Sequence, residues 1–245
     1  ASGMRVEELT ASGADVAYVM PSHQYPLGIV MPIKRRLELL KWAAEKPERY
    51  LIEDDYDSEF RYRGKPIPAL QGVDRAGKVI YIGTFSKSIA PAIRISYRVL
   101  PEPLLATCEP ELQRFSSTVS RIDQMILNSF LKEGHYERHL NRMRAIYGHK
   151  QEILVGELKQ LSGVCTIRGE DAGVHLLLEF SDDWTEAELI RRAEAVHIRV
   201  YPLSEYSIDG ADSGAGQGAT ILLGYATMTE EELAQAARSL TEVWR

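Results

Sequence analysis

The sequence has few of the features that mark secreted, membrane-spanning or nucleic-acid-binding proteins. Its two cysteines, Cys108 and Cys165, are far apart and lack CxxC spacing, so they give neither a zinc site nor a disulfide framework. No apolar run approaches the roughly 18 residues of a membrane span, and no charged-then-apolar leader opens the chain. With 29 basic and 35 acidic residues among 245, the formal net charge is −6, which argues against a nucleic-acid-binding face on this chain. We expect a reduced, cytoplasmic setting.

The first half of the chain alternates short apolar segments with helix-length segments. This pattern predicts an α/β fold with a mostly parallel sheet and flanking helices, in which function collects at the strand ends. Strands are expected at residues 15–20, 50–52, 78–83 and 93–100.

A helix is predicted at residues 32–45, between the first two strands. Its apolar side carries Ile33, Leu37, Leu40 and Trp42, and its opposite side carries Lys34, Arg35 and Arg36.

The second half predicts a smaller α+β domain. Residues 111–162 read as helical with an interruption at Gly134. Helices at 185–196 and 229–244 begin at the caps Thr185 and Thr229, and strands are expected at 173–180, 198–202 and 219–225. The predicted domains are therefore 1–133 and 134–245.

A lysine among hydroxyl residues follows the third predicted strand, in TFSKSIAPAIRISY. Burial there would lower the pKa of the Lys87 amine, as a nucleophilic, Schiff-base-forming lysine requires. Thr84, Ser86 and Arg94 would supply two hydroxyls and one cation, a donor set that suits a phosphate dianion. The alternative is a capped turn with a solvated Lys87 and an ion-paired Arg94.

An acidic cluster, EDDYDSEF, follows the second predicted strand. A metal site is weakly supported, because no histidine lies close in sequence. A carboxylate can instead keep a pyridinium nitrogen protonated, so that the ring acts as an electron sink. Asp54 is the better candidate for this role, and Tyr56 could donate to the ring's phenolate oxygen.

Four fragments in order resemble one protein family: PSHQYPLG, IEDDYDSEF, GTFSKSIAPAIRISY and GHYERHLNRMR. They are similar to the aminotransferase-like domain of GabR/MocR-type transcriptional regulators, and more widely to fold-type I enzymes that use pyridoxal 5'-phosphate (PLP). The resemblance implies that Lys87 is the internal-aldimine lysine, Asp54 the partner of the pyridine nitrogen and Tyr56 the partner of the ring oxygen. It also implies that Ser86, Arg94 and Thr84 are phosphate ligands.

Two positions depart from the pattern of the enzymes. Tyr25 replaces the asparagine of the Asn-Pro-x-Gly motif, and a phenol cannot reproduce the geometry of an amide. Thr227 stands where an arginine would bind the substrate carboxylate. Arg121 could supply a replacement cation, or it is a surface residue at a helix start.

The resemblance further implies a longer protein, whose N-terminal part is missing from this chain. Such a regulator binds DNA only through a winged-helix domain that this chain lacks, forms a homodimer and senses a small amino compound as an external aldimine. A catalytically active PLP-dependent aminotransferase is the alternative. A degenerate scaffold that binds no cofactor is a third reading.

Overall fold

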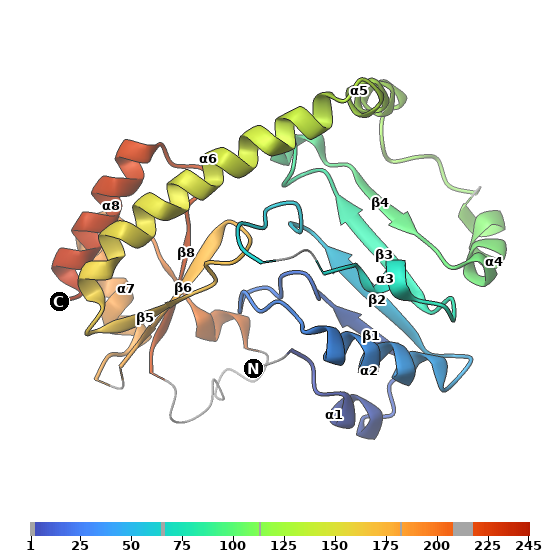
Figure 1. Ribbon diagram of the computed structural model, residues 1–245, viewed down its shortest axis with the longest axis horizontal. Helices are drawn as coiled ribbons and strands as arrows, with labels where there is room; N and C mark the ends of the chain where they lie inside the picture. Colours follow the sequence, from blue (N-terminus) through green and yellow to red (C-terminus); the bar gives the residue numbers. More distant parts are fainter. Residues whose placement is uncertain (1–2, 65–66, 113, 182, 208–217) are drawn as a thin grey trace. The chain divides into compact units, whose positions relative to one another are not determined.

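The computed structural model describes residues 3–64, 67–112, 114–181, 183–207 and 218–245 (Figure 1). The chain divides into two compact units. The first unit comprises Ala1–Tyr25, Ile29–Glu59 and Lys65–Met143, and the second comprises Pro26–Gly28, Phe60–Gly64 and Arg144–Arg245.

The first unit contains a four-stranded sheet in the order β1-β2-β3-β4. Its strands are β1 (Val16–Val19), β2 (Tyr50–Asp55), β3 (Val79–Thr84) and β4 (Ser96–Val99). The first three are parallel, as the sequence predicts, and β4 pairs antiparallel to β3. The carboxyl ends of β1, β2 and β3 therefore share one edge of the sheet.

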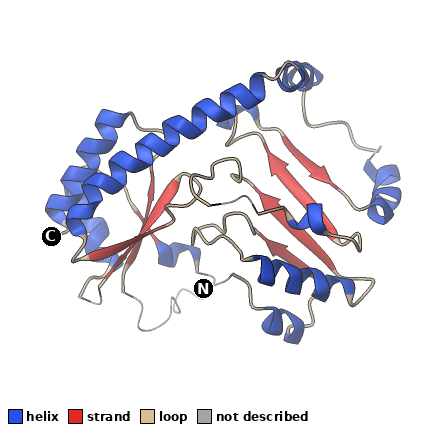
Figure 2. Cartoon of the chain, in the orientation of Figure 1, coloured by secondary structure: helices blue, strands red, loops and turns tan. Residues whose placement is uncertain are grey.

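Two helices of the first unit, α2 and α3, connect these strands, while α1 precedes β1 and α4 and α5 follow β4 (Figure 2). Their bounds are α1 (Val6–Ala11), α2 (Ile33–Ala44), α3 (Leu70–Val73), α4 (Glu102–Leu112) and α5 (Arg121–Lys132). The core includes Leu39 and Trp42 of α2, packed with Ala17, Leu51 and Val79 of the strands.

The predicted orientation of α2 is wrong in part, because Trp42 of the predicted apolar side is buried but other residues are not where they were expected. Ile33 and Leu37 are 48% and 54% exposed, whereas Arg36, predicted on the side opposite the apolar residues, is completely buried. The Arg36 guanidinium donates to the carbonyl oxygens of Met31, Pro68 and Pro21 at 3.0, 2.8 and 2.7 Å. These acceptors compensate for the loss of hydration, so the cation can occupy the core side of the helix.

The continuous helical pattern predicted for residues 111–162 is also wrong in part. Residues 114–120 are not helical, and α5 ends before Gly134, which has a φ of 70°. Glycine adopts this left-handed conformation without the steric cost that a side chain adds. The predicted interruption at Gly134 is thus confirmed, and α6 (His135–Leu158) begins after it.

The second unit is an α+β module, as predicted. Its antiparallel sheet has the order β5-β6-β8-β7, and its helices include the C-terminal part of α6. The remaining elements are β5 (Cys165–Arg168), β6 (His175–Phe180), α7 (Glu186–Ala195), β7 (Tyr201–Pro202), β8 (Thr220–Gly224) and α8 (Glu230–Val243). Trp244 is fully buried and donates from its indole nitrogen to the Leu189 carbonyl at 3.0 Å, which ties the end of the chain to α7.

The predicted cap of α8 is confirmed. Thr229 Oγ1 accepts a bond from the Glu232 amide at 3.2 Å, and the Glu232 carboxylate accepts one from the Thr229 amide at 2.8 Å. We expect Thr229→Ala to cost about 1 kcal/mol, because one amide loses its acceptor. The melting temperature should fall by roughly 2–4 °C in a thermal unfolding experiment. Thr227→Ala, which removes an exposed threonine outside the cap, should leave it unchanged.

Candidate functional site

The turn after β3 carries the predicted phosphate-binding residues Thr84, Ser86 and Arg94. Thr84 Oγ1 accepts a hydrogen bond from the Ser86 amide at 3.2 Å, which tightens the first residues of the turn. The turn closes through a short 3-10 helix, Pro91–Ile93, and returns to β4. Arg94 follows this helix with a φ of 49°, a left-handed conformation that is uncommon for residues other than glycine. Strained backbone of this kind often accompanies a functional site.

Neither sequence-based reading of the turn is fully correct. The side chain of Lys87 is exposed, which contradicts the reading with a buried lysine and agrees with the alternative reading of a solvated lysine. Arg94 is also exposed, and its guanidinium makes no hydrogen bond or ion pair within the described part of the chain. The turn therefore presents an exposed amine and an exposed cation, together with the half-buried side chains of Thr84 and Ser86.

Asp54 lies near the carboxyl end of β2, and β2 is adjacent to β3, the strand that precedes Lys87. In the register of these parallel strands, Asp54 pairs with Ile82 of β3. The Tyr18 hydroxyl, from β1, donates to the Asp54 carboxylate. Burial raises the pKa of Tyr18 to about 12, and the hydrogen bond to Asp54 and the charge of Asp54 add to this effect. Tyr18 therefore remains protonated near neutral pH and fixes the orientation of the carboxylate.

Two neighbouring acids serve the fold instead. Glu53 is fully buried and accepts bonds from the first two amides of α3, Leu70 and Gln71, at 2.9 Å each. Asp55 accepts hydrogen bonds from the hydroxyl groups of Tyr81 and Ser58 at 2.7 and 2.8 Å. Glu53 and Asp55 thus stabilise the fold from one face of β2, whereas Asp54 lies on the opposite face.

A buried histidine-aspartate pair lies beside Tyr56. His23 Nδ1 is 2.8 Å from Asp57 Oδ2, and both side chains are only 1% exposed. The Tyr56 hydroxyl is 3.2 Å from the same nitrogen, and the ring of Tyr25 packs edge-on against Tyr56 with 6.4 Å between centroids. No pattern in the sequence indicated this link between His23 and Tyr56.

The residue after Lys87 is joined to the first turns of α6. Ser88 is buried, and its hydroxyl oxygen lies 3.1 Å from the Tyr136 hydroxyl. The imidazole Nε2 of His139 donates to the Ser88 carbonyl oxygen at 2.9 Å. Tyr136 and His139 of α6 therefore hold the lysine turn in place.

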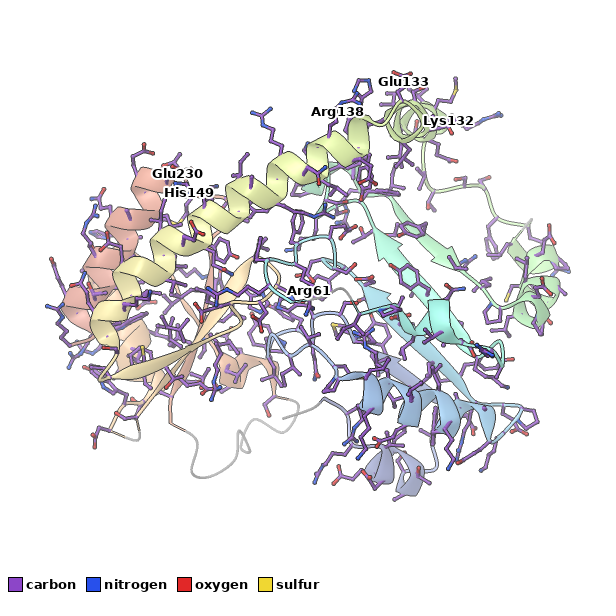
Figure 3. All side chains as sticks on the ribbon, viewed as in Figure 1. Arg61, Lys132, Glu133, Arg138, His149 and Glu230 are labelled. Atoms are coloured by element: carbon purple, nitrogen blue, oxygen red, sulfur yellow. The ribbon has the colours of Figure 1, made fainter. Side chains whose placement is uncertain are left out.

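Other charged residues near the start of α6 contact one another (Figure 3). Arg138 donates to His135 Nδ1 at 2.6 Å, and His135 Nε2 lies 3.2 Å from the Glu133 carboxylate. Arg121 is exposed at the first residue of α5. Thr227 is exposed and follows β8 in the second unit.

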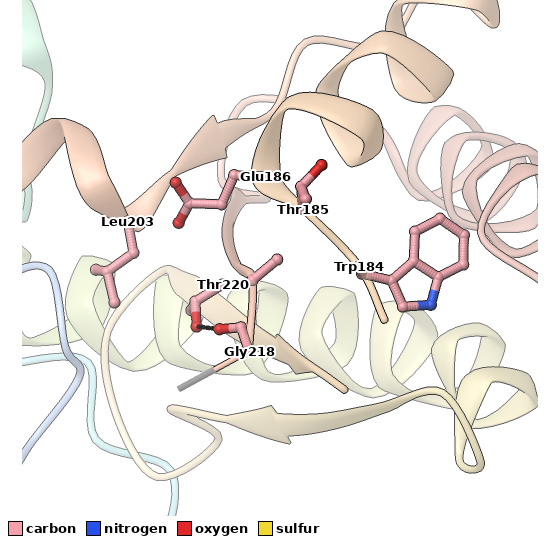
Figure 4. A pocket seen from close by; sticks show the side chains of 7 residues that line it. Trp184, Thr185, Glu186, Leu203, Gly218 and Thr220 are labelled. Atoms are coloured by element: carbon pink, nitrogen blue, oxygen red, sulfur yellow. Dashed lines mark hydrogen bonds between the residues drawn. The ribbon is translucent and has the colours of Figure 1, made fainter. Parts of the chain in front are cut away.

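The second unit also contains a pocket, but its lining carries little chemistry (Figure 4). It is lined by Trp184, Thr185, Glu186, Leu203, Gly218, Ala219 and Thr220. Its carboxylate, that of Glu186, already accepts hydrogen bonds from the Ser204 amide and hydroxyl.

The described residues contain neither a metal-binding cluster nor a membrane-spanning helix. No group of three or more His, Cys, Asp or Glu side chains there could hold a metal ion. None of the helices described is long and apolar enough to cross a membrane.

Comparisons with known proteins relate nearly the whole chain to a large family. Residues 10–240 match the family model described as aminotransferase class I and II. An uncharacterized HTH-type transcriptional regulator of Bacillus subtilis, YdeL, is 39% identical over 99% of this chain and 51% of its own length. A probable rhizopine catabolism regulatory protein of Rhizobium meliloti, MocR, is 35% identical over 97% of this chain and 47% of its own length.

A solved structure shows the same fold. The kynurenine aminotransferase of Pyrococcus horikoshii, in complex with PMP, superimposes with a TM-score of 0.84 and 25% sequence identity. The match covers 99% of this chain and 61% of the aminotransferase. The chain thus spans about half the length of the curated relatives described above.

Proposed function

The chain belongs to the class I and II aminotransferase family, and on this basis we propose that it is the PLP-binding, effector-sensing domain of a GabR/MocR-type transcriptional regulator. One observation carries the proposal. The two regulatory proteins, YdeL and MocR, are 39% and 35% identical to almost the whole chain, whereas the aminotransferase of known structure is 25% identical. In this reading residues 1–133 belong to the cofactor-binding domain and residues 134–245 form the connecting helix and small domain.

The side chains of the first unit fit PLP. Lys87 presents an exposed primary amine, Arg94 offers an exposed guanidinium with no partner in the described residues, and Thr84 and Ser86 of the same turn carry hydroxyl groups. Asp54 and Tyr56 offer a carboxylate and a phenol at the end of the adjacent strand, with Tyr25 packed against Tyr56. This donor set matches an aldehyde, a phosphate dianion and a pyridine ring.

Each side chain has a distinct task in this proposal. When bound, PLP supplies an aldehyde that condenses with primary amines and a ring that withdraws electrons. Lys87 holds it covalently, and Asp54, oriented by Tyr18, keeps a proton on the ring nitrogen. Tyr56 donates a hydrogen bond to the ring oxygen. Arg94, Ser86 and Thr84 bind the phosphate through charge-assisted and hydroxyl hydrogen bonds.

A sensing role is favoured over catalysis by two side chains. Tyr25 stands where the enzymes carry an asparagine amide, and Thr227 stands where they carry a carboxylate-binding arginine. A threonine cannot make the bidentate pair with a carboxylate that a guanidinium makes. Arg121 is the proposed substitute cation. The effector would then be an amino compound held differently from an ordinary amino-acid substrate.

The proposed regulator is a cytoplasmic homodimer that contacts DNA through a winged-helix domain outside this chain. An exposed apolar face on α5 supports a second copy as a partner. Ile122, Met125 and Ile126 on this helix are 70%, 69% and 63% exposed, and burying such a surface would favour association. Light scattering of the full-length protein would give its oligomeric state.

The sensor and the enzyme are distinguished by product formation. The PLP-loaded full-length protein is mixed with a panel of primary amines, and both the absorbance spectrum and the carbonyl product are measured. A sensor changes its spectrum with at least one amine and forms no more than one equivalent of product. Many equivalents of a keto acid would instead support the aminotransferase.

Arg94→Met is expected to weaken PLP binding by roughly 10- to 100-fold. A hydrogen bond to a charged group contributes about 1.5–3 kcal/mol, and about 1.4 kcal/mol corresponds to a tenfold change in affinity. The affinity is measured by absorbance titration. Arg75→Met removes another exposed arginine, from the loop before β3, and should bind PLP like the wild type. Equal affinities for the two variants would exclude Arg94 as a phosphate ligand.

A further inference from the structure

The His23–Asp57 pair is more completely buried than the residues that would touch the cofactor. Both side chains are 1% exposed, whereas Tyr25 is 38% exposed and Lys87 is exposed. His23 follows β1 and Asp57 follows β2, so the two adjacent parallel strands deliver them to the same edge of the sheet. Burying two ionisable groups is costly unless they are paired, and here they are paired at 2.8 Å.

The charge on Asp57 determines which group of the pair carries the proton. When Asp57 is ionised it can only accept, so His23 Nδ1 carries the hydrogen that it donates to Asp57 Oδ2. The Tyr56 oxygen, 3.2 Å from the same nitrogen, can then only accept from that N–H group. The hydroxyl proton of Tyr56 is consequently left to be donated elsewhere.

We propose that His23, held by Asp57, is a positioning residue that fixes the Tyr56 phenol so that its O–H group donates to the ring oxygen of bound PLP. This inference rests on the proposed function. Without the histidine, the phenol loses the donor that occupies its oxygen and is free to rotate or to donate to a neighbouring carboxylate. The role is analogous to that of outer residues that orient the ligands of a metal.

The charges around the pair are consistent with this role. Burial is the main cause that raises the pKa of Asp57, and the hydrogen bond and charge of His23 and the charge of Lys87 lower it. Asp57 Oδ1 has no hydrogen-bond partner within the described residues, so His23 is its one direct hydrogen-bonding partner there. The groups that act electrostatically on Tyr56 are Asp57, Asp54, Tyr25 and Asp55.

The test follows the pH at which the visible absorbance of PLP bound to the full-length protein changes. Removing the hydrogen bond from Tyr56 leaves the ring oxygen more basic, so Tyr56→Phe should raise this pH by about one unit, a tenfold change in proton affinity. His23→Leu should give a rise of similar size. The double variant should equal Tyr56→Phe alone, because the histidine acts through the phenol.

Two polar replacements of His23 distinguish a role in orienting Tyr56 from a role in filling the core. The amide nitrogen of His23→Asn can occupy the place of Nδ1 and should keep the wild-type pH midpoint. His23→Gln places its amide further along the side chain, near the position of Nε2, and should behave like His23→Leu. His175→Leu removes another buried histidine, 6% exposed and 3.0 Å from the Pro26 carbonyl oxygen. It should lower thermal stability without moving the midpoint.

The results of these experiments decide whether His23 positions Tyr56. An unchanged midpoint in the His23→Gln variant, or a double variant whose shift is the sum of the two single shifts, would overturn the positioning role. A wild-type protein that shows no PLP absorbance would instead refute the proposed function itself. If His23→Leu does not fold, the comparison of His23→Asn with His23→Gln still decides.

Discussion

Replacing Lys87 with alanine is expected to abolish covalent binding of PLP. The wild-type protein should develop a visible absorbance band on titration with PLP, and the Lys87→Ala variant should show only the spectrum of the free aldehyde. The physical reason is that the amine of Lys87 lies in a turn with Ser86 and Arg94, which would bind the phosphate and bring the aldehyde within reach.

The control must exclude random reaction with surface amines. Lys41→Ala removes an exposed lysine from α2 and should retain the full absorbance change. Reduction with borohydride followed by peptide mass analysis locates the modified lysine in the wild type. Modification spread over several lysines, or an unchanged spectrum in Lys87→Ala, would refute the assignment.

The second large effect concerns the buried arginine of α2. Arg36→Met is expected to lower the free energy of unfolding by about 3–5 kcal/mol, because three carbonyl oxygens lose a charged donor at once. The melting temperature should fall by roughly 10 °C. One of the three acceptors, Pro21, precedes the segment that carries His23 and Tyr25, so we also expect weaker PLP binding.

Lys34→Met is the matched control for Arg36→Met. It replaces an exposed cation of the same helix with the same side chain and should change the melting temperature by at most about 1 °C. Thermal unfolding followed by circular dichroism measures both variants. Equal melting temperatures would mean that the carbonyl oxygens find other donors when Arg36 is absent.

Local signals in the sequence predicted much of the fold. The caps at Thr185 and Thr229 and the interruption at Gly134 depend on neighbouring residues, and all three are confirmed. The position of Arg36 could not be predicted from periodicity, because its acceptors at Pro21 and Pro68 lie 15 and 32 residues away. The spacing of apolar residues predicts which side chains are buried, but it cannot predict the burial of a cation whose hydrogen-bond acceptors lie far away in sequence.

In the candidate site, too, local motifs could be predicted from the sequence and distant partners could not. Sequence motifs indicated Asp54, Tyr56 and Lys87 because they follow strands that end at one edge of a parallel sheet. The partner of Asp54 was missed, since Tyr18 is a polar-tipped residue inside an apolar strand. Strand register could have revealed it: Tyr18 pairs with Ile52, and Asp54 is the next residue on the same face.

The bonds between Ser88 and α6 have a mechanical consequence. Tyr136 and His139 fasten the first turns of a 24-residue helix to the residue beside the reactive amine. At 1.5 Å per residue the helix is a rod about 36 Å long. Within the first unit, a shift of Ser88 would therefore pass directly to the first turns of this stiff element, because two hydrogen bonds join them.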